Sequence, residues 1–261
     1  MRMLMLSFFS GIVAVCLLGC GSGDDCITVN QSCVAAVDDH TLDCVFVIEN
    51  WLSEVREYAA ETNQLPLPVL ENGKVLHGVR FELLSSHVRR RFRVDSREEE
   101  AAVMALLASK NSDWESRAVQ DALRGIASLH WTIRIPHLWQ PHRQAEAGFM
   151  VGPGAAFDRN NTQTMTDLDH DTILLMSVAP VENWLDPKVD FVFDDWIDLE
   201  QQFSIVSADR TLEHIVVGFA DGTVWRLRRN VPFDVLRPFI SVSDSNLHDR
   251  NSELGKWISP L

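Results

Sequence analysis

The sequence predicts an α+β fold in which a long N-terminal helix packs on a mainly antiparallel β-sheet, accompanied by additional short helices. Three observations predict this class. Apolar residues recur at helical spacing through one long early segment, later segments alternate as strands do, and a turn dipeptide marks one hairpin. The 261 residues, of which 46% are hydrophobic and 23% charged, have the composition of an ordinary folded domain.

The long helix is expected over residues 34–62. Its apolar residues recur at helical intervals, and Pro66 and Pro68 follow its expected end. The recurring residues are Leu42, Val45, Phe46, Ile48, Leu52, Val55 and Tyr58.

The middle of the chain alternates between expected strands and helices. A strand over 75–84 is entered through a turn at Asn72 and Gly73, and Ser96 has Glu99 at the spacing of a capping box. Helices are expected over 97–109 and 113–128, and further strands over 130–135, 148–151 and 172–178.

The clearest hairpin joins strands over 215–219 and 223–227 through Asp221 and Gly222, a dipeptide suited to positive φ. Residues 232–240 are expected to form a short helix that has Pro232 at an early position. The polar tail over 241–261 is expected to be loose.

The N-terminal residues are typical of a secretory signal. Arg2 precedes an apolar run that stops at Leu18, Gly19 and Cys20, and this ending resembles a bacterial lipobox, in which the cysteine is lipidated. The alternatives are a plain signal peptide or an uncleaved anchor with an incidental Cys20. We divide the chain into a signal peptide (1–19), a lipidated Cys20 with a polar tether (20–33), an α+β domain (34–240) and the tail (241–261).

Three cysteines other than Cys16 and Cys20 remain in an oxidising compartment, where disulfides persist. They are Cys26, Cys33 and Cys44, which allow one bridge in three possible pairings. The net charge of −14 argues against a nucleic-acid partner, because such a protein needs a basic surface.

Several segments, taken in order, carry a resemblance to a known family. Cys44, Leu52, Tyr58 and Pro66 are followed by segments 71–80, 151–157 and 167–174, by the Trp184, Pro187 and Asp190 pattern, and by the hairpin over 219–224. Together they resemble the large pseudopilin-like family of Planctomycetes, which is related to the major pseudopilin of type II secretion and has a His-X9-Asp-Gly signature. Asp221 and Gly222 match that signature hairpin. The resemblance implies a pilin-like fold.

The chain departs from the family at several positions. A lipobox replaces the prepilin leader and its hydrophobic stem, so we expect no polymerisation into a fibre of the pilin type. Thr211 stands where the signature has a histidine, and Leu168 and Asp171 replace a glycine and an asparagine.

Four groups of polar residues are candidate sites, each set against a structural alternative. Asp167, Asp169 and Asp171 begin like a calcium loop but lack its glycine and final glutamate, so a solvated turn is the alternative. The remaining groups are a histidine cluster (His130, His137, His142), an acidic run (Asp186, Asp190, Asp194, Asp195, Asp198, Glu200) and a basic patch (Arg89, Arg90, Arg91, Arg93). Zinc, glycosidase chemistry and anionic lipid are the matching hypotheses. The matching alternatives are ordinary half-buried or surface histidines, solvated loops, and charge balance against Glu98, Glu99 and Glu100.

We expect a non-enzymatic envelope lipoprotein that binds or scaffolds at the cell envelope and needs no cofactor. Its partners would be membrane lipid, through the anchor, and other envelope or secretion proteins. Gly21 after Cys20 favours the outer membrane, with the domain in the periplasm or on the surface. The alternatives are an exported hydrolase that uses the acidic or histidine cluster, and an accessory component of a secretion or pilus system.

Overall fold

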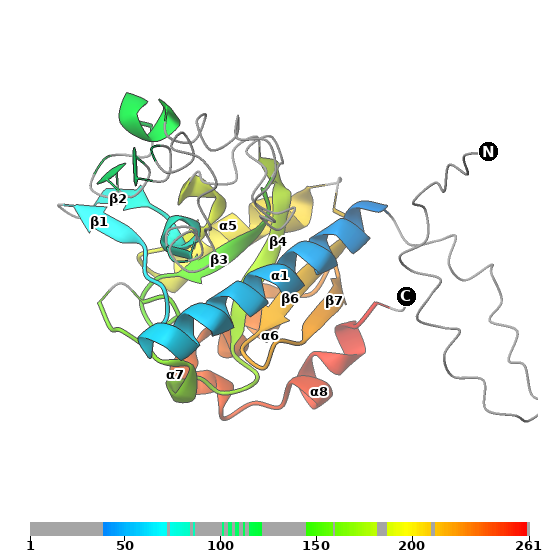
Figure 1. Ribbon diagram of the computed structural model, residues 1–261. Helices are drawn as coiled ribbons and strands as arrows, with labels where there is room; N and C mark the ends of the chain where they lie inside the picture. Colours follow the sequence, from blue (N-terminus) through cyan, green and yellow to red (C-terminus); the bar gives the residue numbers. More distant parts are fainter. Residues whose placement is uncertain are drawn as a thin grey trace, which may run out of the picture. The chain divides into compact units, whose positions relative to one another are not determined.

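A computed structural model describes residues 39–71, 74–83, 86, 145–158, 160–181, 187–209 and 212–259, together with isolated positions between 101 and 121. The α+β class is confirmed, since helix α1 packs on a five-stranded sheet (Figure 1). The sheet strands are β3 (Ala145–Val151), β4 (Ile173–Val181), β5 (Phe191–Val192), β6 (His214–Phe219) and β7 (Val224–Arg228). The helices are α1 (Asp39–Thr62), α5 (Trp196–Ala208), α6 (Phe233–Ile240), α7 (Val242–Ser245) and α8 (Arg250–Glu253), with 3-10 turns η4 (Met165–Asp167), η5 (Pro187–Val189) and η6 (Gly255–Trp257).

The strands of the main sheet lie in the order β5-β3-β4-β6-β7. All neighbours are antiparallel except β3 and β5, so the mainly antiparallel sheet is confirmed. Two short strands, β1 (Val69–Glu71) and β2 (Lys74–His77), form a separate antiparallel pair. Among the described residues, no helix is long and apolar enough to cross a membrane.

Helix α1 crosses one face of the sheet and contacts β3, β4, β6 and β7 (Figure 1). Its buried residues recur at helical spacing, as the sequence predicts, and it ends at Thr62 as expected. The helix lies very close to β6, because a Cβ atom added at Gly218 would stand 2.5 Å from Ile48. The buried residues are Cys44, Ile48, Trp51, Leu52, Glu54, Val55 and Ala59.

The expected strand over 75–84 is wrong in its second half. Strand β2 ends at His77, and residues 79–83 are helical. The backbone turns here, since the amide of Phe81 donates to the carbonyl of Gly78, and this turn directs Arg80 into the core. The apolar residues of this short helix alternate with other residues in the sequence as they would in a strand, and this pattern led to the wrong prediction.

The C-terminal hairpin and the helix after it are confirmed in β6, β7 and α6, and Gly222 has the expected positive φ, +83°. Strands β3 and β4 are confirmed within longer spans than expected. Where the structure describes the expected helices over 97–109 and 113–128, it has helix at 101, 104, 105, 108 and 117–121, and the strand over 130–135 lies outside the described residues.

The expected loose tail is wrong for residues 242–259, which form α7, α8 and η6. Ser245 and Leu254 are fully buried, and Ile258 makes a β-bridge with Leu227 of β7. The segment is polar on average, and Leu254 is buried whereas Leu247 and Ile258 are exposed, so composition alone concealed its packing. Helix α5 was also missed, because its residues were included in an acidic run that predicted loops.

Candidate functional site

The turn of the β6–β7 hairpin is held by side chains from two directions. Asp221 accepts hydrogen bonds from the backbone amide and the hydroxyl of Thr223, at 2.8 and 2.6 Å. Arg56 of α1 donates to the carbonyl of Ala220 at 3.0 Å. A Cβ atom at Gly222 would lie 2.2 Å from the Arg56 guanidinium and would displace that side chain, while the positive φ favours glycine here.

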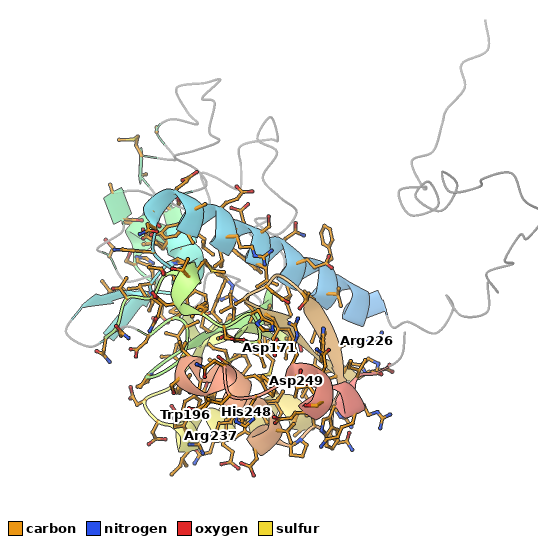
Figure 2. The ribbon with its side chains drawn as sticks, turned by 90° about the horizontal axis from the view of Figure 1, so that it is seen from below. Asp171, Trp196, Arg226, Arg237, His248 and Asp249 are labelled. Carbon is orange, nitrogen blue, oxygen red and sulfur yellow. The ribbon has the colours of Figure 1, made fainter. Side chains whose placement is uncertain are left out.

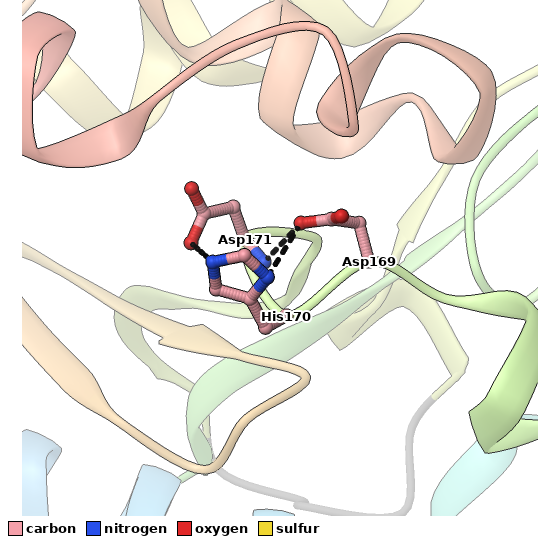
Figure 3. Close-up of side chains that lie close together, drawn as sticks. All are labelled: Asp169, His170 and Asp171. Carbon is pink, nitrogen blue, oxygen red and sulfur yellow. Dashed lines mark hydrogen bonds and ion pairs between the residues drawn. The ribbon is translucent and has the colours of Figure 1, made fainter.

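A second turn, which precedes β4, lies against the first one. The Asp221 amide donates to the carbonyl of His170 at 3.3 Å, and the Ala220 amide donates to that of Thr172 at 2.8 Å. In this second turn both ring nitrogens of His170 contact carboxylates, Asp169 at 3.1 Å and Asp171 at 3.1 Å (Figure 3). The imidazole is exposed, whereas Asp171 is buried.

Arg250 of α8 joins the two turns into one polar cluster, which we define as Asp169, His170, Asp171, Asp221 and Arg250. Its Nε lies 3.0 Å from Oδ1 of Asp171, and its backbone amide donates to Oδ2 of the same carboxylate at 3.2 Å. Its Nη2 donates to Asp221, and its Nη1 donates to the Thr223 hydroxyl at 2.7 Å. Figure 2 shows Asp171 beside Asp249, the residue that precedes Arg250.

The guanidinium of Arg250 also stacks on the sheet. Its carbon lies 4.7 Å from the ring centre of Phe219 and 5.2 Å from that of Trp225. Gly218 faces α1, so the adjacent Phe219 side chain points to the opposite face. Arg250 therefore covers the face of the sheet that α1 leaves open, and cation–π attraction adds to its two ion pairs.

The groups that surround Asp221 in the polar cluster favour its ionised form. Partial burial raises the pKa of Asp221, but hydrogen bonds from Arg250 and Thr223 outweigh burial and bring that pKa down to about 2. Asp221 therefore stays ionised and keeps its ion pair with Arg250 throughout the neutral pH range.

The polar cluster also contains the residues that could hold a metal. Asp169, His170 and Asp171 each offer a ligand atom, and these atoms lie within 4.8 Å of one another. Asp167, the third calcium candidate, points elsewhere: its carboxylate accepts from the amide and hydroxyl of Thr164 at 2.7 and 2.8 Å, and the backbone bond chiefly lowers its pKa. Arg250 already supplies Asp171 with a positive partner. A calcium site in this turn therefore stays a prediction.

A second ion pair lies deep in the core. Arg80 and Asp190 are buried and their side chains meet at 2.5 Å. Asp190 also accepts from the Phe149 amide at 3.1 Å, and Arg80 donates to the carbonyl of Ala147. Burial raises the pKa of Asp190 and lowers that of Arg80, and their mutual attraction opposes both shifts. The guanidinium lies over Trp51 and Phe149.

The acidic run separates into different roles. Asp190 belongs to the core ion pair, and Asp195 caps α5 by accepting from the amides of Ile197 and Asp198, each at 2.9 Å. Asp194 and Glu200 are exposed, and Asp186 lies outside the described residues. The described carboxylates do not converge on one pocket.

The other predicted site residues are outside the described residues: the three histidines of the cluster, the four arginines of the basic patch, and Cys20, Cys26 and Cys33. Cys44 is buried in α1. The candidate disulfide and the zinc and lipid hypotheses therefore stay predictions.

Two open depressions meet at the turn after β7. One, of about 590 Å³, is lined by Glu213, His214, Arg228, Arg229 and Asn230. The other, of about 420 Å³, shares Arg229 and Asn230 and extends along α5 past Glu200, Ser204 and Ser207. Neither was expected from the sequence.

Comparison with protein-family models, curated proteins and solved structures finds no match for this chain. The fold is therefore established by the structure alone, and the pseudopilin-like assignment remains a proposal.

Sequence reasoning found Asp171, Asp221 and Asp190 but missed their partners Arg250 and Arg80. Arg250 follows Asp249, which accepts from the amide of Asn251 as a helix cap. The cap residue Asp249, followed by Glu253 and then by the apolar Leu254, was the available signal for a packed helix.

Proposed function

We propose that this protein is a membrane-anchored envelope lipoprotein whose pseudopilin-like domain serves in binding or scaffolding and catalyses no reaction. One observation carries the proposal: the face of α1 that carries Ile48, Leu52 and Val55 is buried on the domain's own sheet, although Phe46 on the same helix is exposed. Ile48 and Leu52 of α1 approach Gly218 of β6 so closely that no part of another subunit fits between the helix and the strand. A pilin-type helix that is buried in this way suits a monomeric head rather than a fibre subunit.

The charged groups support binding rather than catalysis. Arg80 and Asp190 neutralise each other in the core, and Arg250 pairs with both Asp171 and Asp221 at the hairpin turn. A general acid or base must be able to exchange a proton with a substrate, and these carboxylates are committed to structural partners. We propose no cofactor for the domain.

The anchor in this proposal is a lipid on Cys20, which follows the apolar run and the lipobox-like ending. Acyl chains hold such proteins at a bilayer through the burial of many CH₂ groups. The proposed location is the cell envelope, with the outer membrane as the favoured bilayer. Membrane lipid and other envelope or secretion proteins are the proposed partners.

Membrane fractionation of the Cys20→Ala variant, combined with intact-mass measurement, tests the proposal. The wild type should be recovered from the membrane with a mass that fits loss of residues 1–19 and addition of acyl chains. Cys20→Ala should retain the leader and carry no acyl mass, while the matched control Cys16→Ala should behave like the wild type. Wild-type protein without acyl mass would refute the anchor.

A further inference from the structure

The direction of α1 fixes which end of the sheet lies beneath its first turn. Ile48 and Leu52 lie over Gly218, and Arg56, further along α1, reaches Ala220, further along β6. Helix and strand therefore run in the same direction. Since a helix rises about 1.5 Å per residue and a strand about 3.3 Å, the start of α1 at Asp39 lies near the start of β6 at His214.

This end of the sheet carries a concentration of basic side chains. His214 pairs across the strands with Arg228, the last residue of β7, and Arg229 and Asn230 follow in the turn. Together with Glu213 they line the open depression of about 590 Å³. Arg228 is exposed and Arg229 is partly exposed. Two guanidiniums against one carboxylate make this a locally positive hollow on a chain whose net charge is −14.

The chemistry of the hollow suits a phosphate group. Guanidinium forks bind phosphate oxygens through paired hydrogen bonds, and the Asn230 side-chain amide adds a neutral donor. The adjoining depression is lined by Glu200, and its Ser204 and Ser207 hydroxyls donate to backbone carbonyls, so the phosphate site is confined to the hollow around Arg228 and Arg229. Arg229 also donates to the carbonyl of Asp209 at 3.4 Å, a long bond that holds the turn without neutralising the arginine.

We propose that this hollow binds the phosphate of anionic phospholipids and thereby docks the domain on its own membrane. The inference rests on the proposed lipid anchor. Cys20 precedes Asp39 by 19 residues, so a lipid on Cys20 would join the chain only a short way before the start of α1 and would raise the effective concentration of the domain at the bilayer. An arginine near an anionic bilayer strengthens binding about fivefold, so the arginine pair is sufficient to bias an anchored domain toward the bilayer.

Hydrogen exchange of the full lipidated chain tests the proposal on two kinds of vesicle, phosphatidylcholine alone and phosphatidylcholine with about one third phosphatidylglycerol. The backbone amides of Arg229 and Asn230 should exchange at least about fivefold more slowly on the anionic vesicles. In the Arg228→Gln/Arg229→Gln variant the two vesicles should give equal rates. The control Arg117→Gln/Lys188→Gln removes the same charge at exposed positions and should retain the wild-type difference.

Equal exchange of the wild type on both vesicles would overturn the proposal, as would slowing that survives in the Arg228→Gln/Arg229→Gln variant. If glycerol 3-phosphate alone, without vesicles, slows the amide exchange to the same extent, the hollow binds a soluble phosphate ligand. This result would overturn the membrane docking. Flotation on the neutral vesicles reports the lipid anchor separately. Absence of the lipid anchor and absence of phosphate binding by the hollow therefore give different experimental results.

Discussion

Arg250 of α8 donates to the carboxylate of Asp221, 29 residues earlier, across the turn of the β6–β7 hairpin. The same guanidinium pairs with Asp171 in the turn before β4. The last helical segment of the chain therefore fastens two turns of the sheet to each other. Their backbones also bond directly, so the end of the sheet behaves as one unit.

Arg250→Gln should lower the free energy of unfolding by about 3 kcal/mol, because it leaves the buried carboxylate of Asp171 without its ion-pair partner. Urea denaturation followed by circular dichroism measures the change. Lys256→Gln, at an exposed position in the neighbouring η6, serves as control and should change stability by less than about 0.5 kcal/mol. Equal effects of the two substitutions would contradict the role of Arg250.

Acid should weaken the hairpin turn through Asp221. Its pKa is about 2 in the folded chain against an ordinary value of 3.8, so its stabilising contribution is fully present above pH 4 and is lost as the pH falls toward 2. The stability difference between wild type and Asp221→Asn should therefore shrink as the pH is lowered from 5 to 2. In an Arg250→Gln background the difference should be smaller at every pH. A difference that does not vary with pH would oppose this account.

The core ion pair should show strong coupling in a double-mutant cycle. Asp190→Asn and Arg80→Met should each destabilise the fold by about 3–5 kcal/mol, because each leaves one buried charge without its partner. The double variant should lose less than the sum of the two. Additive losses, measured by urea denaturation, would show that the pair does not act as a unit.

The close approach of α1 to β6 depends on Gly218. Gly218→Ala should destabilise by about 1–3 kcal/mol, because the added Cβ would lie 2.5 Å from Ile48. Gly255→Ala is the matched control, since a Cβ there meets nothing within 4 Å. Ile48→Ala is destabilising by itself because Ile48 is buried, but the double variant Gly218→Ala/Ile48→Ala should lose less than the sum of the two single losses, whereas additive losses would place the clash elsewhere. Thermal unfolding of the four variants measures these effects.

The C-terminal segment should contribute to stability through its buried leucine. Leu254→Ala should cost about 2–5 kcal/mol, since Leu254 is fully buried. Leu247→Ala, in the same segment but 78% exposed, should have almost no effect. Limited proteolysis of the Leu254→Ala variant should cut first between residues 241 and 261. Resistance equal to that of the wild type would contradict the role of Leu254 in holding this segment.

The elements that could be predicted from the sequence are those whose signal is local. The helical periodicity through Ile48, Leu52 and Val55 and the turn dipeptide at Asp221 and Gly222 are set by neighbouring residues, so α1 and the hairpin were predicted closely. The tail and the segment around Arg80 were not, because their conformation depends on partners distant in sequence. Asp190 is 110 residues from Arg80, and Asp171 is 79 residues from Arg250.

The same division holds for the candidate sites. The sequence by itself determined the fold class, the order of the main elements and the acidic members of the polar cluster. Only the tertiary structure decided what those carboxylates do, because whether an acid is catalytic, metal-binding or structural depends on which cation folding places beside it. Here that cation is an arginine from a segment whose composition predicted a loose tail. The basic hollow likewise exists only once β6, β7 and the turn after them are assembled.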